Sequence, residues 1–253
     1  MLQQQPITLK LAAPPPLDVR AHALFLDLDG TLVPFATSPQ QVYASDEVKL
    51  LLAQLFNEMG GAVAIVTGRT IESADTVLAG SLINIAGIHG FARRDATRTI
   101  PTAEDTSAID RALHDARLLK SEGQLDAEIE DKSAALTFHY RTNPGAAPQA
   151  QHAAQTLARR HGLHVVQGAM VVELTLGVRN KGDAVADFMN DAPFSGRAPI
   201  AIGDDITDED AFIRVNAMNG ASILVGPQRQ TAARHHLPGI DAAIAWLQAG
   251  LAS

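Results

Sequence analysis

Short runs of apolar residues recur along the chain, and their lengths are typical of buried strands. We place these strands at residues 23–26, 62–66, 82–88, 199–203 and 222–225. Apolar residues at helical spacing separate them, and helices are expected at 45–59, 71–78, 181–189, 207–217 and 240–247. Ser45 is the expected N-cap of the first helix and Thr207 that of the fourth. Strands that alternate with helices pair in parallel through right-handed crossovers, so the pattern predicts an α/β core with a parallel sheet.

A different pattern interrupts this core between residues 103 and 177. The expected elements, in order, are a helix at 103–120, strands at 127–131 and 134–140, a helix at 148–160, and strands at 163–167 and 170–176. Gly168-Ala169 is expected to join the last two strands as a hairpin. The repeated helix–strand–strand order predicts a separate α+β unit with an antiparallel sheet. We therefore expect an inserted domain at 103–177 that splits a core domain into residues 21–102 and 178–253.

Residues 1–20 precede the first strand and differ in composition from the rest. They contain Gln3-Gln4-Gln5 and Pro14-Pro15-Pro16, and they lack the apolar stretch and cleavage site of a signal peptide. We expect a flexible or strapped arm at 1–20, and a cytoplasmic protein.

Composition narrows the classes of partner. The chain has 253 residues, of which 46% are hydrophobic and 19% charged, as in ordinary globular proteins. Its formal net charge of -8 argues against a nucleic-acid partner, which would require a basic surface. Without cysteine the chain has neither disulfides nor thiolate metal sites. No apolar run is long enough to span a membrane, so we expect no membrane partner.

Asp27 and Asp29 follow the first predicted strand and are the first candidates for chemistry. Side chains alternate along a strand, so both carboxylates point the same way, and Gly30 lets the chain turn away after them. Adjacent like charges raise each other's pKa unless a cation lies between them, so the pair indicates a bound metal or a shared proton. An ordinary strand-to-loop corner is the alternative. A calcium loop is disfavoured because its third acid and its final glutamate are missing.

Three further polar residues belong to the same edge of the predicted sheet. Thr67 ends the second strand, Asp204 follows the fourth, and Lys181 begins the helix after the insertion. Open parallel sheets bind ligands beyond the carboxyl ends of their strands, so these residues should converge on Asp27 and Asp29. Carboxylates suit Mg²⁺, whereas the Thr67 hydroxyl and the Lys181 ammonium suit a phosphate. A lysine at a helix N-terminus opposes the helix dipole, which favours this function over a merely solvated side chain.

The order of these residues resembles the signature of the haloacid dehalogenase (HAD) superfamily of phosphatases. Its four elements correspond to Asp27-Leu28-Asp29-Gly30-Thr31, Thr67, Lys181 and Gly203-Asp204-Asp205. The segments that are similar to the narrower trehalose-6-phosphate phosphatase family are 66–69, 87–90, 130–132, 139–141, 180–182 and 203–212. The resemblance covers the chain from about Ala23 onward. It implies a HAD-like (Rossmann-like) α/β core with a parallel sheet and an inserted α+β cap domain. One departure is Phe91-Ala92-Arg93, where the family more often has a glutamate.

The resemblance implies roles in catalysis for residues of the core. Asp27 would attack phosphorus and form an aspartyl-phosphate. Asp29 would protonate the leaving sugar oxygen and then deprotonate the attacking water. Thr67, Gly68 and Lys181 would bind the phosphate.

The resemblance also implies a set of metal ligands. Mg²⁺ would be held by a carboxylate oxygen of Asp27, the backbone carbonyl of Asp29 and Asp204. Asp205 and Asp208 would orient the waters of the metal. For Asp208 the alternative is an ordinary acid in the first turn of a helix.

The cap is implied to close over the sugar and to exclude water. Glu130 and Lys132 share one face of a predicted strand, and Glu173 is a lone carboxylate in an apolar strand. A buried carboxylate needs a partner, which a sugar hydroxyl can supply. These three positions match the family's sugar-binding residues, and Arg69 and His89 complete the implied substrate-binding set. A surface Glu–Lys pair and a strand-edge glutamate are the alternative.

The resemblance implies a Mg²⁺-dependent phosphatase that hydrolyses trehalose 6-phosphate to trehalose and phosphate, and we expect a monomer. A HAD phosphatase for another sugar phosphate, such as sucrose or mannosylglycerate phosphate, is an alternative because the cap decides the sugar. A receiver-like module that holds phosphate as a signal is a third, but it has no acid two residues after its aspartate and no inserted cap. A P-loop kinase is excluded because Gly-x-x-x-x-Gly-Lys-Ser/Thr does not occur.

Overall fold

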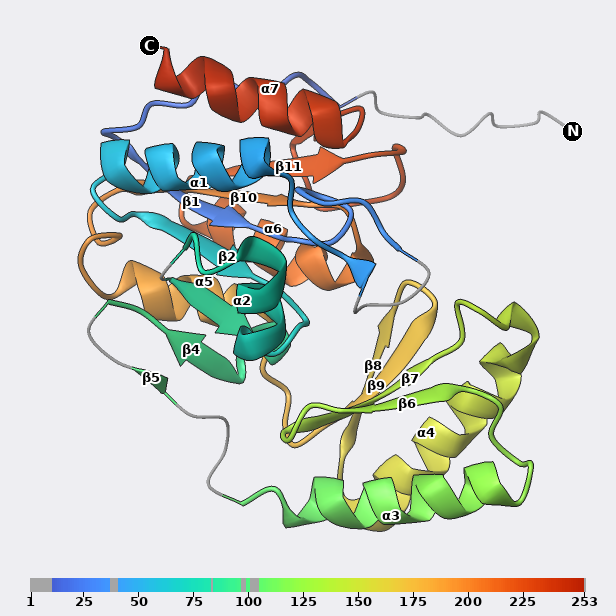
Figure 1. The fold of residues 1–253 in the computed structure, drawn as a ribbon. Helices are drawn as coiled ribbons and strands as arrows, with labels where there is room; N and C mark the ends of the chain where they lie inside the picture. Colours follow the sequence, from blue (N-terminus) through green and yellow to red (C-terminus); the bar gives the residue numbers. More distant parts are fainter. Residues whose placement is uncertain (1–10, 37–40, 83, 97–98, 101–104, 253) are drawn as a thin grey trace, which may run out of the picture.

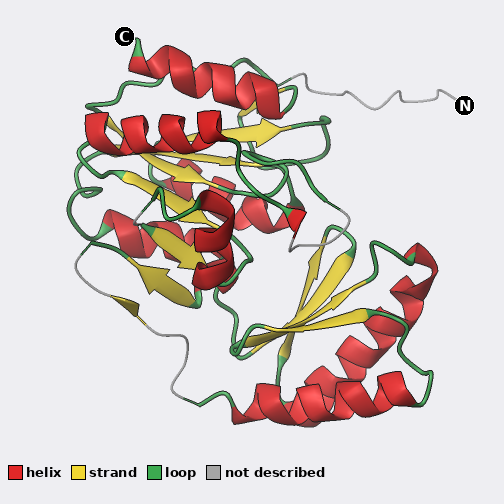
Figure 2. Cartoon of the chain, in the orientation of Figure 1, coloured by secondary structure: helices red, strands yellow, loops and turns green. Residues whose placement is uncertain are grey.

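The computed structural model describes residues 11–36, 41–82, 84–96, 99–100 and 105–252. They form two units side by side, each a sheet covered by helices (Figure 1). Strands and helices alternate in the larger unit, and the smaller unit has its helices on one side of its sheet (Figure 2). No helix in these ranges is both long and apolar enough to cross a membrane.

The larger unit contains an eight-stranded sheet in the order β12-β11-β10-β1-β2-β3-β4-β5. Its strands are β1 (His22–Leu26), β2 (Val63–Val66), β3 (Ile85–Gly87), β4 (Ala92–Arg94), β5 (Thr99–Ile100), β10 (Ala198–Gly203), β11 (Ala221–Val225) and β12 (His235–Leu237). Neighbours from β12 to β3 pair in parallel, which confirms the predicted parallel sheet. The strand expected at 82–88 is shorter than predicted: β3 begins at Ile85, and it ends at Gly87 because Ile88 and His89 turn away from the sheet with φ of 49° and 52°.

Helices cover both faces of this sheet. The helices are α1 (Asp46–Glu58), α2 (Ile71–Leu78), α5 (Lys181–Met189), α6 (Glu209–Ala217) and α7 (Ile240–Leu251). α1 and α7 lie together on one face, and α5 and α6 lie on the other (Figure 1). Ser45 caps α1 as predicted, since its side chain accepts a hydrogen bond from the Val48 N–H. Thr207 as an N-cap is wrong: it lies inside a 3₁₀ turn at Ile206–Asp208, and the Asp205 carboxylate caps that turn instead.

Aromatic packing fills the larger unit beneath β1. The rings of Phe25 and Phe194 stack with centroids 5.5 Å apart, and Phe188 packs against both. Arg93 lies 4.2 Å over the Phe188 ring and pairs with Asp95 and Asp191. Arg93, in the segment that departs from the family pattern, is therefore a buried packing residue.

The described part of the predicted arm, residues 11–20, lies against the larger unit. Leu17 is buried in the core, and Ala12 forms a bridge with His235. The Trp246 indole donates to the Pro15 carbonyl over 3.0 Å, so this tryptophan contributes to packing. Residues 1–10 of the predicted arm lie outside the described residues.

The smaller unit contains a four-stranded antiparallel sheet in the order β6-β7-β9-β8. Its elements are α3 (Ser107–Ser121), β6 (Glu128–Asp131), β7 (Ala135–His139), α4 (Ala147–His161), β8 (His164–Gly168) and β9 (Val171–Thr175). The helix–strand–strand order occurs twice, as predicted. The turn between β8 and β9 is at Ala169–Met170, one residue later than predicted, and Met170 adopts the left-handed φ of 63°.

The two faces of the smaller sheet differ in polarity. Phe138, Leu136 and Val172 are fully buried in a cluster with residues of α3 and α4. Side chains alternate along strands, so the intervening residues point the other way, toward the larger unit. On this second face, Thr137 of β7 lies in register between Glu130 of β6 and Glu173 of β9. The polar face of the smaller sheet is therefore turned toward the carboxyl ends of β1 and β2.

Candidate active site

A cavity of about 170 Å³ lies between the larger sheet and the polar face of the smaller one. The predicted site residues that line it are Asp27, Asp29, Thr67, Gly68, Arg69, His89, Glu130, Lys132, Glu173, Lys181 and Asp205. Asp204 and Asp208 do not line the cavity but lie beside Asp27. The fold thus brings together residues that are far apart in the sequence.

Asp27 and Lys181 form the centre of the site. The backbone N–H of Asp27 donates to Ile202 of β10, which fixes its position at the end of β1. Lys181 opens α5, whose N-cap Asn180 forms a capping box with Asp183. The Lys181 Nζ lies 2.6 Å from Asp27 Oδ1, so the helix start presents its cation directly to the strand end.

Burial decides the charge of these groups. Burial raises the pKa of the Asp27 carboxyl well above its usual range, and the Lys181 cation opposes this rise. Burial by itself would lower the pKa of Lys181, but the carboxylates of Asp208 and Asp27 outweigh it and raise that pKa above its ordinary value. Lys181 is therefore a fixed positive charge at neutral pH.

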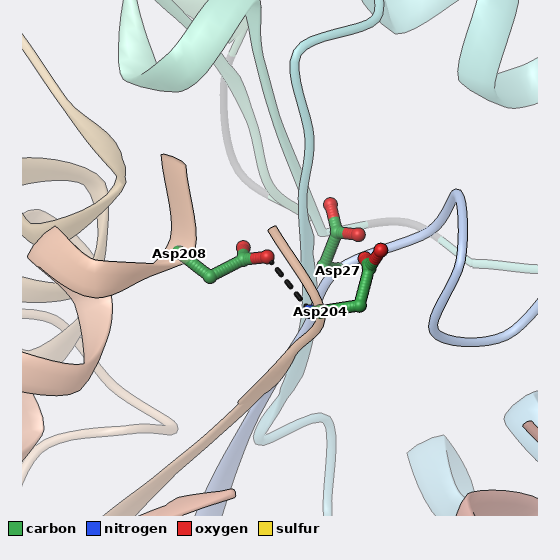
Figure 3. A group of neighbouring side chains, drawn as sticks. All are labelled: Asp27, Asp204 and Asp208. Carbon is green, nitrogen blue, oxygen red and sulfur yellow. Dashed lines mark hydrogen bonds between the residues drawn. The ribbon is translucent and has the colours of Figure 1, made fainter. Parts of the chain in front are cut away.

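Asp27, Asp204 and Asp208 form an acidic cluster beside the cavity (Figure 3). One carboxylate oxygen of each lies within 4.8 Å of the others. Burial, together with the neighbouring Asp208 carboxylate, raises the pKa of Asp204 to about 7. Three partly desolvated acids at this spacing repel one another, so the cluster fits a cation better than it fits protein groups alone.

The acids of the cluster differ in what they have left to offer a metal. Asp208 uses both oxygens: Oδ1 accepts from Lys181, and Oδ2 accepts from the backbone N–H groups of Asp204 and Asp205, the first of which is the dashed line in Figure 3. Asp27 Oδ1 accepts from Lys181, whereas Asp27 Oδ2 and Asp204 Oδ1 lie 3.3 Å and 3.2 Å from the Thr31 hydroxyl. Asp27 and Asp204 therefore keep carboxylate oxygens that can bind a metal, and Asp208 holds the loop of Asp204 and Asp205 in place.

Asp29 is paired with Arg69 across the cavity. Two guanidinium nitrogens of Arg69 lie 2.6 Å and 2.7 Å from the two carboxylate oxygens of Asp29, which is a bidentate arrangement. Arg69 also donates to the Ser73 hydroxyl over 3.1 Å. The pairing holds the Asp29 carboxylate in the wall of the cavity.

The loop after β2 is locked to the turn after β3. The N–H of Ile88 donates to the Arg69 carbonyl over 2.8 Å, and the N–H of His89 donates to the Thr67 carbonyl over 3.0 Å. A Cβ atom at Gly68 would lie 2.6 Å from His89 Nε2, so any larger residue there would displace the His89 ring. Backbone strain at Ile88 and His89 is held by these bonds, as is common at functional sites.

Three buried side chains of the smaller unit form a hydrogen-bonded group above this loop. Lys132 Nζ donates to Glu173 Oε2 over 2.6 Å and to the Gly68 carbonyl over 2.9 Å. The Thr137 hydroxyl donates to the same Glu173 oxygen over 2.5 Å. The other carboxylate oxygen, Glu173 Oε1, is buried and has no hydrogen-bond partner. An acceptor of this kind requires a donor, which a ligand hydroxyl can provide.

The charges of this group follow from its burial. Burial would raise the pKa of Glu173, but the Lys132 cation overcomes this and lowers it to about 2. Burial lowers the pKa of His89 to about 4. His89 is thus neutral at pH 7, and its 3.5 Å contact with Glu173 Oε1 is not an ion pair at that pH.

The cavity is also lined by polar residues of the smaller unit that the sequence analysis did not predict as site residues. These residues are Glu128, Thr137, His139 and Arg141. His139 Nε2 lies 2.7 Å from Glu130, and its hydrogen bond lowers the pKa of that carboxyl against the opposing effect of burial. Thr137, His139 and Arg141 alternate along the chain, so strand periodicity places them on the face of Glu173. This two-residue periodicity is the sequence signal that could have identified them as residues of the site.

Known proteins resemble this chain over most of its length. A model of the family described as trehalose-phosphatase matches residues 25–238. A probable trehalose-phosphate phosphatase of Sinorhizobium fredii is 39% identical over 212 residues, covering 83% of this chain and 80% of that protein. The trehalose-6-phosphate phosphatase of Escherichia coli is 34% identical over 247 residues, covering 96% of this chain and 91% of that one. A solved trehalose-6-phosphate phosphatase related protein matches with a TM-score of 0.73 and 27% identity, covering 89% of this chain and 95% of its own.

Proposed function

Since the chain belongs to the trehalose-phosphatase family, we propose that it hydrolyses trehalose 6-phosphate to trehalose and inorganic phosphate with Mg²⁺ as cofactor. The chain is a phosphatase with a HAD-like fold. The main support for a sugar substrate is that Glu130, Lys132 and Glu173 of the smaller unit line the same cavity as Asp27 of the larger unit. Glu173 Oε1 is a buried acceptor without a donor, and a sugar hydroxyl would satisfy it.

Asp27 is the proposed nucleophile. One of its carboxylate oxygens forms a bond to phosphorus, and the bond from phosphorus to the sugar oxygen breaks, leaving an aspartyl-phosphate. The fixed cation of Lys181, 2.6 Å from Asp27, stabilises the carboxylate and the phosphate oxygens that approach it. A Mg²⁺ ion held by Asp27, Asp204 and the Asp29 carbonyl would neutralise the remaining negative charge.

Asp29 is the proposed acid and base. It gives a proton to the departing sugar oxygen and then takes one from the water that attacks phosphorus. That attack breaks the bond between phosphorus and the Asp27 oxygen and releases inorganic phosphate. Arg69, which holds both Asp29 oxygens, keeps the carboxylate oriented toward the cavity. As a cation within the cavity, Arg69 is also a candidate ligand for the phosphate of the substrate.

The loop Thr67–Gly68 is the proposed phosphate cradle, together with Lys181. The Thr67 side chain is buried at the cavity floor and already accepts from the Arg69 N–H, so its hydroxyl proton is available to a phosphate oxygen. The bonds to Ile88 and His89 keep this loop rigid. A rigid cradle favours the geometry of in-line attack, because less ordering is required when the substrate binds.

Phosphate release from a panel of esters tests this proposal. The panel contains trehalose 6-phosphate, sucrose phosphate, mannosylglycerate phosphate and p-nitrophenyl phosphate, each assayed with Mg²⁺ and with EDTA. We expect the largest kcat/KM with trehalose 6-phosphate and only in Mg²⁺. A larger kcat/KM for another sugar phosphate would move the assignment to that sugar. Stable phosphorylation of the protein without turnover would support the receiver-like alternative.

A further inference from the structure

The turn between β8 and β9 touches the larger unit through the peptide groups of Ala169. The Ala169 N–H donates to Asp205 Oδ2 over 3.0 Å. The Ala169 carbonyl accepts from Arg141 over 3.1 Å, and the Arg141 guanidinium lies 4.5 Å over the ring of Phe35 in the larger unit. The turn is therefore held to the larger unit directly through Asp205 and indirectly through Arg141.

Asp205 is itself fixed to the acidic cluster. Its backbone N–H donates to Asp208 Oδ2 over 2.9 Å, and its backbone carbonyl accepts from Arg229 over 2.7 Å. Its second carboxylate oxygen accepts from the Ile206 N–H. Asp208 in turn holds Lys181. A residue held by these three bonds to the core cannot follow a movement of the smaller unit, so its contact with Ala169 fixes the position of the turn.

A second contact lies at the opposite corner of the smaller sheet. Lys132 directly follows β6 and bonds to the Gly68 carbonyl, whereas Ala169 directly follows β8. β6 and β8 are the two outer strands of the sheet. The strand register also places the last residue of β6 and the last residue of β8 at opposite ends of the sheet. Contacts at two diagonal corners fix both the distance and the tilt of a sheet.

We propose that Asp205 is a positioning residue, which receives the Ala169 N–H when the cap closes and so sets Lys132 and Glu173 at their working distance from Asp27. This role rests on the proposed function, because it matters only for a substrate that reaches the cap. This role differs from the orientation of metal-bound water that the family resemblance implies for Asp205, because both of its carboxylate oxygens already accept hydrogen bonds, one from Ala169 and one from Ile206. A hydrogen bond to a charged group is worth about 1.5–3 kcal/mol, which corresponds to roughly 10- to 100-fold in kcat/KM.

Substitution of Ala169 tests the contact without altering Asp205. Ala169→Pro removes the N–H donor, and proline was chosen because Met170 has the positive φ that follows proline in a type II turn. Ala169→Val is the matched control, since it adds similar bulk and keeps the N–H. We expect Ala169→Pro to lower kcat/KM for trehalose 6-phosphate about 10-fold relative to Ala169→Val. Turnover of p-nitrophenyl phosphate, which is too small to reach the cap, should be equal in the two variants and reports a folded core.

Variants of Asp205 complete a thermodynamic cycle. Asp205→Asn keeps an acceptor oxygen for Ala169, so it should retain more activity toward trehalose 6-phosphate than Asp205→Ala. If the contact acts as one unit, Asp205→Ala combined with Ala169→Pro loses no more than the larger single loss. Equal kcat/KM for Ala169→Pro and Ala169→Val, or fully additive losses in the combined variant, would overturn the proposal.

A distance measurement separates this proposal from the proposed function. The chain has no cysteine, so spin labels can be placed at two introduced cysteines, Glu58→Cys in the larger unit and Glu122→Cys in the smaller. Both positions are exposed. Ala169→Pro should broaden the distance distribution relative to Ala169→Val, with or without substrate, and identical distributions would refute the contact. A wild-type protein that releases no phosphate from trehalose 6-phosphate would refute the proposed function instead.

Discussion

Replacing Glu173 by glutamine removes one partner of the buried ion pair in the smaller unit. The Glu173 and Lys132 side chains are 4% and 8% exposed, and their charged atoms are 2.6 Å apart. Glutamine keeps the shape and an acceptor oxygen for Thr137 but removes the charge. The Lys132 ammonium then keeps the Gly68 carbonyl and, at the longer distance of 4.0 Å, the Glu130 carboxylate as partners. Breaking a buried pair by removing one partner costs about 3–5 kcal/mol, because the remaining charge is uncompensated.

The pKa of Glu173 gives a second measure of the same loss. The pKa falls from an ordinary value of 4.5 to about 2 on folding, and such a shift corresponds to about 3 kcal/mol. The folded-state pKa is lowered, so the stabilisation is complete above pH 4.5 and is lost as the pH falls toward 2. Both routes give about 3 kcal/mol at pH 7.

Urea unfolding, monitored by hydrogen exchange of the amides in β7 and β9, measures the difference in stability between Glu173→Gln and wild type. We expect Glu173→Gln to lower the free energy of unfolding of the smaller unit by about 3 kcal/mol at pH 7. The difference from wild type should shrink as the pH is lowered below 4.5. Lys132→Met combined with Glu173→Gln is the control and should recover part of the loss, since no unpaired charge remains. A Glu173→Gln variant as stable as wild type at pH 7, or a difference that does not change with pH, would refute the reasoning.

Three further outcomes are expected for activity. Asp27→Asn should abolish phosphate release, because enzymes accelerate the hydrolysis of phosphate monoesters by up to ~10²¹-fold over the uncatalysed rate. A variant that keeps more than a few per cent of the wild-type activity would contradict covalent catalysis. EDTA should abolish turnover and added Mg²⁺ should restore it and raise the melting temperature, whereas full turnover in EDTA would exclude the metal assignment. Glu130→Ala should lower kcat/KM for trehalose 6-phosphate by roughly 10- to 100-fold; equal losses with p-nitrophenyl phosphate would mean that Glu130 supports the fold.

The sequence was informative where side chains carry the signal. The apolar run 23–26 predicted β1 because a parallel strand is buried on both faces. The rule that ligands bind at the carboxyl ends of parallel strands then brought Asp27, Thr67 and Lys181 to one edge. The short strands β4, β5 and β12 escaped prediction, since two or three residues carry no measurable periodicity.

Two hydrogen bonds between the units could not be predicted, because one partner in each is a backbone atom. Lys132 bonds to the carbonyl of Gly68, and Asp205 accepts the N–H of Ala169. Every residue has such groups, so no residue type marks the position. Thr207 failed as a cap for a related reason: hydroxyls and carboxylates compete for the same N–H groups, and Asp205, which comes first in the chain, takes them.

The place of β1 in the large sheet also sets an order of events during synthesis. β1 pairs with β10, which emerges from the ribosome about 170 residues later, or roughly 10–30 s at the usual rates of translation. The smaller sheet is built from one continuous stretch and can be completed within that interval. Until β10 arrives, one edge of β1 has unpaired backbone groups beside the apolar side chains of residues 23–26. The nascent chain therefore presents a finished cap next to an open sheet edge, and that edge is where chaperones would bind and aggregation would begin.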